Sequence, residues 1–231
     1  MKRFILLLYL PTLSISLNLS LLDYHDPTAN HILDAEVIDN TLIISAMVQG
    51  IEFYDISDPA TLNHLSHFTL GGGVKSNCVT ASGNYAYFTS SNGVYVVNIS
   101  NPSNPSNYGN ISGTSGLILE NLDVYGNTLA VCAHADGVKL YDVSNPSNPS
   151  YSSRIPTNNA WGVVLSNNLA YVADESDVLV VDIADITLPE IVTSVQTGNA
   201  VKDVAVDANY LYVALGSDGV DIYDITNPTL P

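Results

Sequence analysis

A ten-residue segment recurs five times along the chain, and its spacing restricts the fold more than any other feature. Each copy has a turn residue, usually glycine, then an apolar strand, an Asp or Asn, and a loop that generally contains proline. The anchor positions are Asp55, Asn98, Asp142, Asp182 and Asp224. The intervals between them are 43, 44, 40 and 42 residues, a period typical of blade-type repeats. The sequence therefore predicts one domain built from repeats.

The third copy shows the strands that one repeat is expected to contain. Residues 121–125, 128–133 and 138–143 alternate apolar and polar side chains and are rich in β-branched and aromatic residues. They are too short, and too often interrupted by Gly, Asn and Pro, to form helices. A less regular fourth strand follows each proline loop, as at residues 190–196. Four antiparallel strands per repeat predict the blade of a β-propeller.

Local signals define both ends of the third strand. Asn92-Gly93, Asp136-Gly137 and Asp218-Gly219 precede it in three copies, and we expect type I′ turns there because these dipeptides tolerate positive φ angles. The Asp-Pro or Asn-Pro that follows ends the strand, since proline lacks a ladder donor. The anchor side chains are placed to accept a hydrogen bond from the turn backbone. We interpret these as structural turn residues: Asp55, Asn98, Asp142, Asp182 and Asp224.

The blades are expected at residues 31–73, 74–117, 118–159, 160–200 and 201–231. The last range holds no outer strand, whereas Ser20 to His25 have the register of a fourth strand without a blade of its own. The sequence therefore predicts an all-β fold, a β-propeller of about five four-stranded antiparallel blades. An N-terminal strand within residues 20–28 completes the last blade and leaves no free edge. The domain then covers residues 20–231, and a truncated longer propeller is the competing interpretation.

The first residues resemble a secretory signal. Lys2 and Arg3 precede an apolar run, and small residues suit cleavage after Ser16. Residues 1–16 are accordingly expected to be a signal peptide, and an uncleaved anchor is the alternative. Beyond this signal or anchor we expect no membrane insertion. The protein is then extracellular, periplasmic or attached to the cell surface.

The composition argues against some partners. The formal net charge is −17 with 6 Lys and Arg, so nucleic acid is a poor partner. Solubility is the default explanation of the acidic surface, although a cation, a basic partner or a saline habitat also fits. Cys78 and Cys132 fall at unrelated repeat positions and are expected to be core thiols rather than a disulfide.

A family resemblance follows from the repeated segments. Leu179-Val-Val-Asp182, Val94-Tyr-Val-Val-Asn98 and Val220-Asp-Ile-Tyr-Asp224, each followed by its loop, resemble the LVIVD repeat. The resemblance covers roughly residues 30–231 and implies a β-propeller, of a kind mostly found on bacterial and archaeal surfaces or secreted, often without an assigned activity. It carries over no catalytic residue. The fourth copy departs from the pattern, with Asp177 in place of the turn glycine and Ile186 in place of the loop proline.

Candidate binding residues lie where the innermost strands begin, at the channel mouth of a propeller. Blade-to-blade variation at fixed repeat positions is what a site grafted on a scaffold would show. The chain has one tryptophan, and it falls in this ring, where a stacking role competes with ordinary packing. The predicted binding residues are Asp34, Asn77, Glu120, Asn121, Trp161, Lys202 and Asp203.

The loops on the same face add further carboxylates, and oxygen ligands of this kind are suited to Ca²⁺. Lys202 in the same ring and the absence of an EF-hand spacing argue against a metal, so no cofactor is expected, with Ca²⁺ as the alternative. His64 and His67 are three residues apart in an expected strand, so we expect them on opposite faces and unable to chelate one ion. No nucleophile-elbow, phosphate-loop or zincin motif is present.

These features favour a secreted or surface β-propeller that acts as a non-catalytic binding or interaction module. Its partner would be a protein, a small molecule or a glycan. The alternative is a hydrolase or lyase that uses a carboxylate pair, such as Glu120 with Asp34 or Asp203, or a bound cation at the mouth. A purely structural envelope module is a third interpretation.

Overall fold

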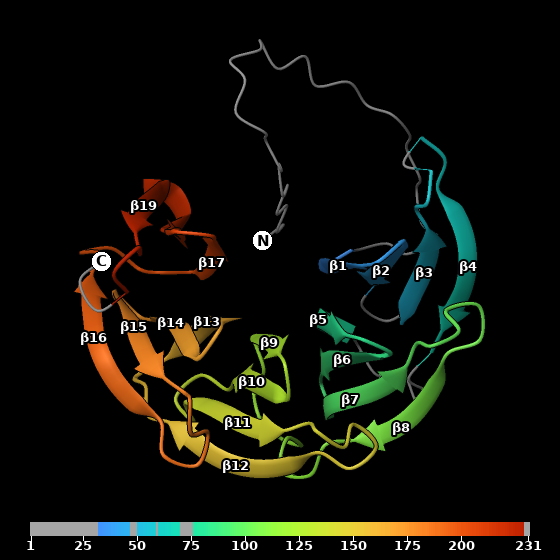
Figure 1. Ribbon diagram of the computed structural model, residues 1–231, viewed down its shortest axis with the longest axis horizontal. Helices are drawn as coiled ribbons and strands as arrows, with labels where there is room; N and C mark the ends of the chain where they lie inside the picture. Colours follow the sequence, from blue (N-terminus) through green and yellow to red (C-terminus); the bar gives the residue numbers. More distant parts are fainter. Residues whose placement is uncertain (1–31, 47–49, 59, 70–75, 229–231) are drawn as a thin grey trace.

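The computed structural model describes residues 32–46, 50–58, 60–69 and 76–228, which form five antiparallel sheets around a common axis (Figure 1). The chain is a five-bladed β-propeller, and the predicted all-β fold class is confirmed. The only helical segment among the described residues is the short 3-10 turn η1 (Gly216–Asp218).

Within each blade the strands run outward from the axis in chain order. The first blade contains β1 (Asp34–Ile38), β2 (Thr41–Ser45), β3 (Ile51–Asp55) and β4 (Asn63–Phe68). The second contains β5 (Ser76–Ser82), β6 (Tyr85–Ser90), β7 (Gly93–Asn98) and β8 (Ser106–Asn110). The third contains β9 (Asn121–Tyr125), β10 (Thr128–Cys132), β11 (Val138–Asp142) and β12 (Ser150–Ile155). The fourth contains β13 (Ala160–Ser166), β14 (Leu169–Asp174), β15 (Asp177–Asp182) and β16 (Glu190–Gln196). The fifth contains β17 (Asp203–Asp207), β18 (Tyr210–Ala214) and β19 (Val220–Asp224).

Apolar side chains between the blades form the core. Alternate residues of a strand point to opposite faces of its sheet, and a blade with a neighbour on each side buries both faces. The middle strands are therefore nearly continuous apolar runs, as in β15, where residues 178–181 are all buried. Four hydrophobic clusters join successive blades; examples are Phe53 with Phe88, Tyr87 with Leu129, Leu140 with Val172, and Tyr171 with Leu211.

The anchor residues make the same contact in every blade. In each, one side-chain oxygen accepts a hydrogen bond from the backbone N–H two residues later, which closes the turn after the third strand. The donor–acceptor distances are 2.8 Å from Ser57 to Asp55, 2.9 Å from Ser100 to Asn98, and 2.8 Å from Ser144 to Asp142, Ala184 to Asp182 and Thr226 to Asp224. Turn hydrogen bonds lower the pKa of Asp55, Asp142 and Asp224.

The turns before the third strand differ from the expected type I′ geometry. That geometry requires positive φ at both central residues, but Asn92, Asp136 and Asp218 do not have positive φ. Only the following glycines do, with φ of 114° at Gly93 and 79° at Gly137. In the fourth blade, which lacks this glycine, positive φ falls on Glu175. The expectation of type I′ turns was therefore wrong, although the hairpins they were meant to explain are present.

A bulge in the first blade overturns the expectation for His64 and His67. The β3–β4 register shifts between Phe53 and Tyr54, which aligns His64 with Tyr54 and His67 with Glu52. Glu52 and Tyr54 are two residues apart on β3, so their side chains share a face. The extra residue of the bulge places both histidines on that face as well.

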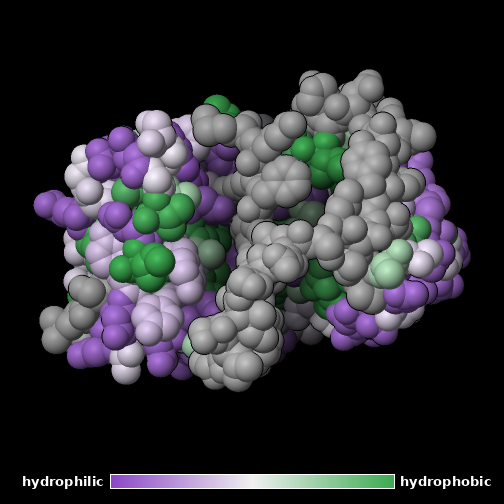
Figure 2. Space-filling model, turned by 90° about the horizontal axis from the view of Figure 1, so that it is seen from above, coloured by the Kyte–Doolittle hydropathy of each residue, from purple (hydrophilic) through white to green (hydrophobic). Residues whose placement is uncertain are grey.

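The fifth blade has three strands among the described residues, and the predicted fourth strand at Ser20 to His25 lies outside them. The expected signal at residues 1–16 also lies outside. Hydrophobic residues reach the surface over this blade (Figure 2), where Val220 and Ile222 of β19 are 61% and 62% exposed. An edge strand with exposed apolar residues is a surface that another strand can cover.

The anchor contact leads to a direct test. Asp142→Ala should lower the Tm by about 2–4 °C, because it leaves the Ser144 amide without its acceptor. Asp142→Asn keeps an acceptor oxygen, as Asn98 does in the second blade, and should stay close to the parent protein. Thermal unfolding followed by circular dichroism measures both variants. Equal losses in the two would show that charge, and not the turn hydrogen bond, is what the anchor contributes.

The predicted completion of the fifth blade can be tested by truncation. A chain that begins at residue 29 should have a lower Tm than one that begins at residue 17, because the β19 edge would lose its partner strand. A synthetic peptide of residues 17–28 should restore part of the loss, and a scrambled peptide should not. Equal Tm values for the two truncations would contradict closure by this segment and favour the truncated longer propeller.

Candidate functional site

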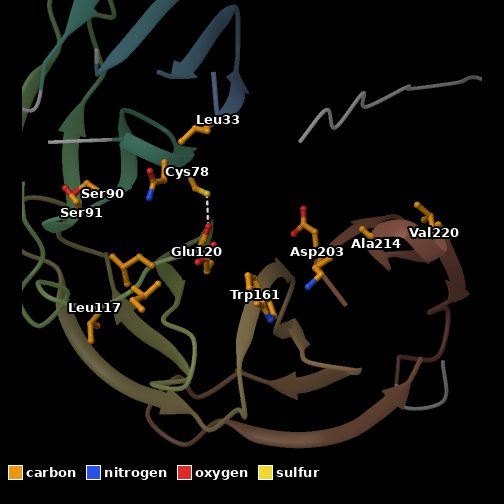
Figure 3. Close-up of a pocket in the computed structure, with 16 residues that line it drawn as sticks. Leu33, Cys78, Ser90, Ser91, Leu117, Glu120, Trp161, Asp203, Ala214 and Val220 are labelled. Atoms are coloured by element: carbon orange, nitrogen blue, oxygen red, sulfur yellow. Dashed lines mark hydrogen bonds between the residues drawn. The ribbon is translucent and has the colours of Figure 1, made fainter. Parts of the chain in front are cut away.

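A cavity of about 850 Å³ opens at the channel mouth, on the face where the innermost strands begin. Figure 3 shows Cys78, Glu120, Trp161 and Asp203 projecting toward it from four successive blades. The loops after the second strands and the connection before β9 complete its wall. The lining residues are Leu33, Asn77, Cys78, Ser90, Ser91, Leu117, Ile118, Leu119, Glu120, Trp161, Lys202, Asp203, Ala214, Gly216, Gly219 and Val220.

Five of the seven predicted binding residues line this cavity: Asn77, Glu120, Trp161, Lys202 and Asp203. The other two lie beside it and bind protein groups. Asp34 Oδ2 accepts a hydrogen bond from the Val79 amide at 3.0 Å. Asn121 is buried, and its Nδ2 donates to Asp203 Oδ1 at 3.2 Å.

Glu120 is held by His134, and His134 is in turn held by Asn159. His134 Nε2 lies 2.6 Å from Glu120 Oε1, and His134 Nδ1 lies 2.6 Å from Asn159 Oδ1. Neither His134 nor Asn159 lines the cavity, while Glu120 does. Both nitrogens of the His134 ring are thus engaged. Of these three residues, Glu120 is the one that a ligand in the cavity would contact.

Trp161 lies between two polar groups. The His134 ring meets it in an edge-on arrangement with centroids 4.8 Å apart. The Lys202 ammonium lies 4.6 Å from the Trp161 ring centroid, within the range of a cation–π interaction. These contacts fix the ring at the cavity wall, and part of its surface remains accessible.

At the start of its innermost strand the fourth blade has a glycine, where the neighbouring blades have polar side chains. The missing side chain leaves room for Asp203. Gly162 occupies the repeat position of Asn121 and Asp203, as the strand registers show. A Cβ atom built on Gly162 would lie 2.6 Å from Asp203 Oδ1. Glycine therefore allows the Asp203 carboxylate to pass and reach Asn121, two blades away.

Sequence reasoning missed two parts of the site. Leu117, Ile118 and Leu119 form an apolar wall in the connection between the second and third blades, and Ile118 is 67% exposed. An apolar run inside an otherwise polar connection was the available signal. Asn159 gave no signal, because its role depends on a contact with His134, a residue of another loop.

The cysteines and the loop carboxylates have structural partners. Cys78 and Cys132 are both buried thiols, and the Cys78 thiol donates to the Glu120 carbonyl at 2.8 Å (Figure 3). The Asp174 carboxylate accepts from the amides of Asn158 and Asn159. Within the described residues, no group of three or more His, Cys, Asp or Glu is arranged to hold a metal ion. The expectation of no cofactor, with Ca²⁺ as the alternative, stays a prediction.

The LVIVD repeat model matches the sequence in four segments, residues 73–112, 120–157, 158–197 and 198–231. These segments cover more than half of the chain. The chain belongs to the LVIVD repeat family. The first blade lies outside the matched segments, although its strand order is that of the matched blades. None of the curated proteins matches the chain.

Solved structures resemble this LVIVD propeller in fold. A functionally unknown protein from Desulfotomaculum acetoxidans has 16% identity and a TM-score of 0.68, over 84% of this chain and 69% of that one. A chain in the nidogen/laminin complex has 10% identity and a TM-score of 0.61, over 84% and 75%. Hsv2 of Kluyveromyces lactis has 14% identity and a TM-score of 0.60, over 84% and 60%. At these identities the likeness shows the fold alone.

Below the mouth, the channel of the LVIVD propeller contains carboxylates that repel one another. Burial, together with the charges of Asp123 and Asp34, raises the pKa of Glu36 to about 7. Burial also raises the pKa of Asp123 to about 6, against the lowering effect of hydrogen bonds from Leu165, Val124 and Thr80. The channel therefore has a negative potential at neutral pH.

These raised pKa values predict a pH-dependent stability. The folded protein keeps protons on Glu36 and Asp123 that the unfolded chain releases, so their contribution to stability declines as the pH rises from about 4 to about 7. Glu36→Gln should flatten this decline and raise the free energy of unfolding at pH 8 by about 1–2 kcal/mol. Urea unfolding of both proteins at several pH values measures the effect. Glu190→Gln, at an exposed position on β16, is the control, and identical profiles for Glu36→Gln and the parent would disprove the assignment.

Proposed function

We propose that this LVIVD propeller is a secreted or cell-surface binding module that holds a protein, small-molecule or glycan ligand at the channel mouth without turning it over. The observation that carries the proposal is the 850 Å³ cavity, whose walls are built from repeat positions at which the five blades differ. Concave sites of this size, with apolar walls and a few polar groups, are typical ligand sites.

Some repeat positions keep one residue type in all five blades and others differ from blade to blade, and this contrast supports a binding role. The anchor after the third strand is Asp or Asn in every blade, because each blade needs the same turn. At one repeat position beside the start of the innermost strands, the residues are instead Leu33, Asn77, Glu120, Trp161 and Lys202. No shared structural requirement explains five different residue types at one repeat position. A site grafted on the scaffold accounts for them.

Two further features favour an extracellular interaction module. The first 16 residues have the pattern of a secretory signal. As a separate finding, none of the helical segments in the described part of the chain could span a bilayer. A chain of similar fold occurs in the nidogen/laminin complex, so this scaffold is found within a protein–protein complex. Propeller folds commonly serve as binding scaffolds.

The contacts of Glu120 favour binding over catalysis. A general base must reach the proton that it removes. His134 beside Glu120 is the usual type of residue for that role, but both of its nitrogens are already engaged, by Glu120 and by Asn159. The hydrolase or lyase alternative would then depend on Glu120 itself, paired with Asp203. Amide substitution of these two carboxylates distinguishes the alternatives, since a binder has no turnover to lose.

The proposal predicts the behaviour of Trp161 variants on ligand screens. Labelled protein on glycan and peptide arrays should give hits that Trp161→Ala weakens roughly 30-fold, as expected for an aromatic anchor worth about 2 kcal/mol. Tyr210→Ala, at an exposed aromatic outside the cavity, is the matched control and should retain every hit. Isothermal titration calorimetry of each hit gives the affinities of the parent protein and of both variants.

Two results would contradict the proposal. Ligands that still bind Trp161→Ala but no longer bind Tyr210→Ala would place the binding surface outside the mouth. Turnover of glycan or ester substrates that is lost in Glu120→Gln would replace the binding module by an enzyme.

A further inference from the structure

The Lys202 ammonium identifies the kind of ligand that the mouth accepts. It is the only cationic group of Lys or Arg among the residues that line the cavity, and it lies over the Trp161 ring rather than in open solvent. The stem of Lys202 runs along Gly216, with Lys202 Cγ 3.7 Å from a Cβ atom built on that glycine. An ammonium over the face of an indole is the geometry by which proteins recognise organic cations.

The ring that carries this ammonium is held in place before any ligand arrives. Besides the Lys202 ammonium, Trp161 contacts the His134 ring. Both nitrogens of His134 are engaged, one by Glu120 and the other by Asn159. A preorganised aromatic platform lowers the cost of ordering side chains on binding. The platform is available to any cation that displaces Lys202.

The charges around the platform favour a positive ligand. Glu120 and Asp203 line the cavity, and Asp34, Glu36 and Asp123 lie along the channel. Burial, and after it the charges of Asp123 and Asp34, raise the pKa of Glu36. Lys202 offsets only part of this charge, so the mouth attracts cations and repels anions.

We infer that the channel mouth binds an alkylammonium group, which replaces the Lys202 ammonium on Trp161 while its alkyl stem packs on the apolar wall of Leu117 and Leu119. This inference rests on the proposed function and names the ligand chemistry of that site. Lys202 is then a built-in competitor. Its displacement returns rotamer freedom to a long side chain, and the incoming group takes its place near the carboxylates. The ammonium can come from a lysine side chain of a partner protein or from a free amine.

Three matched probes test the charge preference. N-acetyl-lysine methylamide supplies the ammonium, the norleucine analogue is its neutral counterpart, and the glutamate analogue carries a carboxylate. We expect the ammonium probe to bind most tightly, with emission of the single tryptophan as the readout. Its affinity should fall as salt is raised from 20 to about 300 mM, because screening weakens the attraction.

Substitution of Lys202 provides the decisive variant. Lys202→Met keeps a long apolar stem and removes the competing charge, so it should bind the ammonium probe about fivefold more tightly than the parent protein. Lys139→Met is the matched control, because Lys139 lies 5.7 Å from the centroid of the Tyr151 ring, outside the cavity. It should leave the affinity unchanged. A cooperative thermal transition would show that each variant is folded.

The two possible sources of the ammonium are compared directly. Butylammonium represents a free amine, and a tripeptide with a central lysine represents a protein side chain. Tighter binding of the tripeptide would assign the natural ligand to a protein, and tighter binding of butylammonium would assign it to a small amine. Both results support the inference.

The inference fails if Lys202→Met binds the ammonium probe more weakly than the parent, or if the neutral or carboxylate probe binds more tightly than the ammonium probe. Either result would leave a functional mouth with a different ligand class, so the proposed function would stand. If the parent and both variants bind no probe and the array screen also gives no Trp161-dependent hit, both proposals fall together.

Discussion

Polar side chains near the axis link the inner strands of the first four blades to one another, and the arrangement of the site depends on these contacts. Asp34 accepts from the Val79 amide at 3.0 Å, Cys78 donates to the Glu120 carbonyl at 2.8 Å, and Asp123 accepts from the Leu165 amide at 2.6 Å. Sheets that pack face to face otherwise share only side-chain contacts. The residues that set the spacing of the blades are therefore neighbours of those that form the cavity. A substitution at the mouth acts on both.

The fold could be predicted because its determinants lie within single repeats. An anchor such as Asp142 acts on a backbone amide two residues away, and the hairpins join strands that are adjacent in sequence. Repetition then removes ambiguity, since five weak local signals with one period are far more specific than one. A further repeated feature was overlooked in the sequence: an asparagine in each inner turn, such as Asn127, whose carbonyl accepts from the residue after the anchor, here Val143.

The site was predictable as a place but not as a set of contacts. The register of the innermost strands put Glu120, Trp161 and Lys202 in one ring, because equivalent repeat positions lie at equivalent heights along the axis. Partners from different repeats could not be derived in this way. The contact of Cys78 with the Glu120 carbonyl joins two blades. The face of the sheet on which His64 and His67 lie depends on one inserted residue in a strand. Such details depend on how side chains pack in three dimensions and not on the period of the sequence repeat.

The channel carboxylates have opposite effects on stability and on binding, and both have one physical cause. Charged groups that are buried near one another destabilise the folded state, which is why burial and Asp123 together raise the pKa of Glu36. The same negative potential concentrates cations at the mouth. Lys202 is placed where it relieves part of this repulsion without entering the channel, because Trp161 holds its ammonium at the rim. A ligand ammonium at that point would relieve the repulsion in the same way, so binding at the mouth and stability of the ring are expected to be coupled.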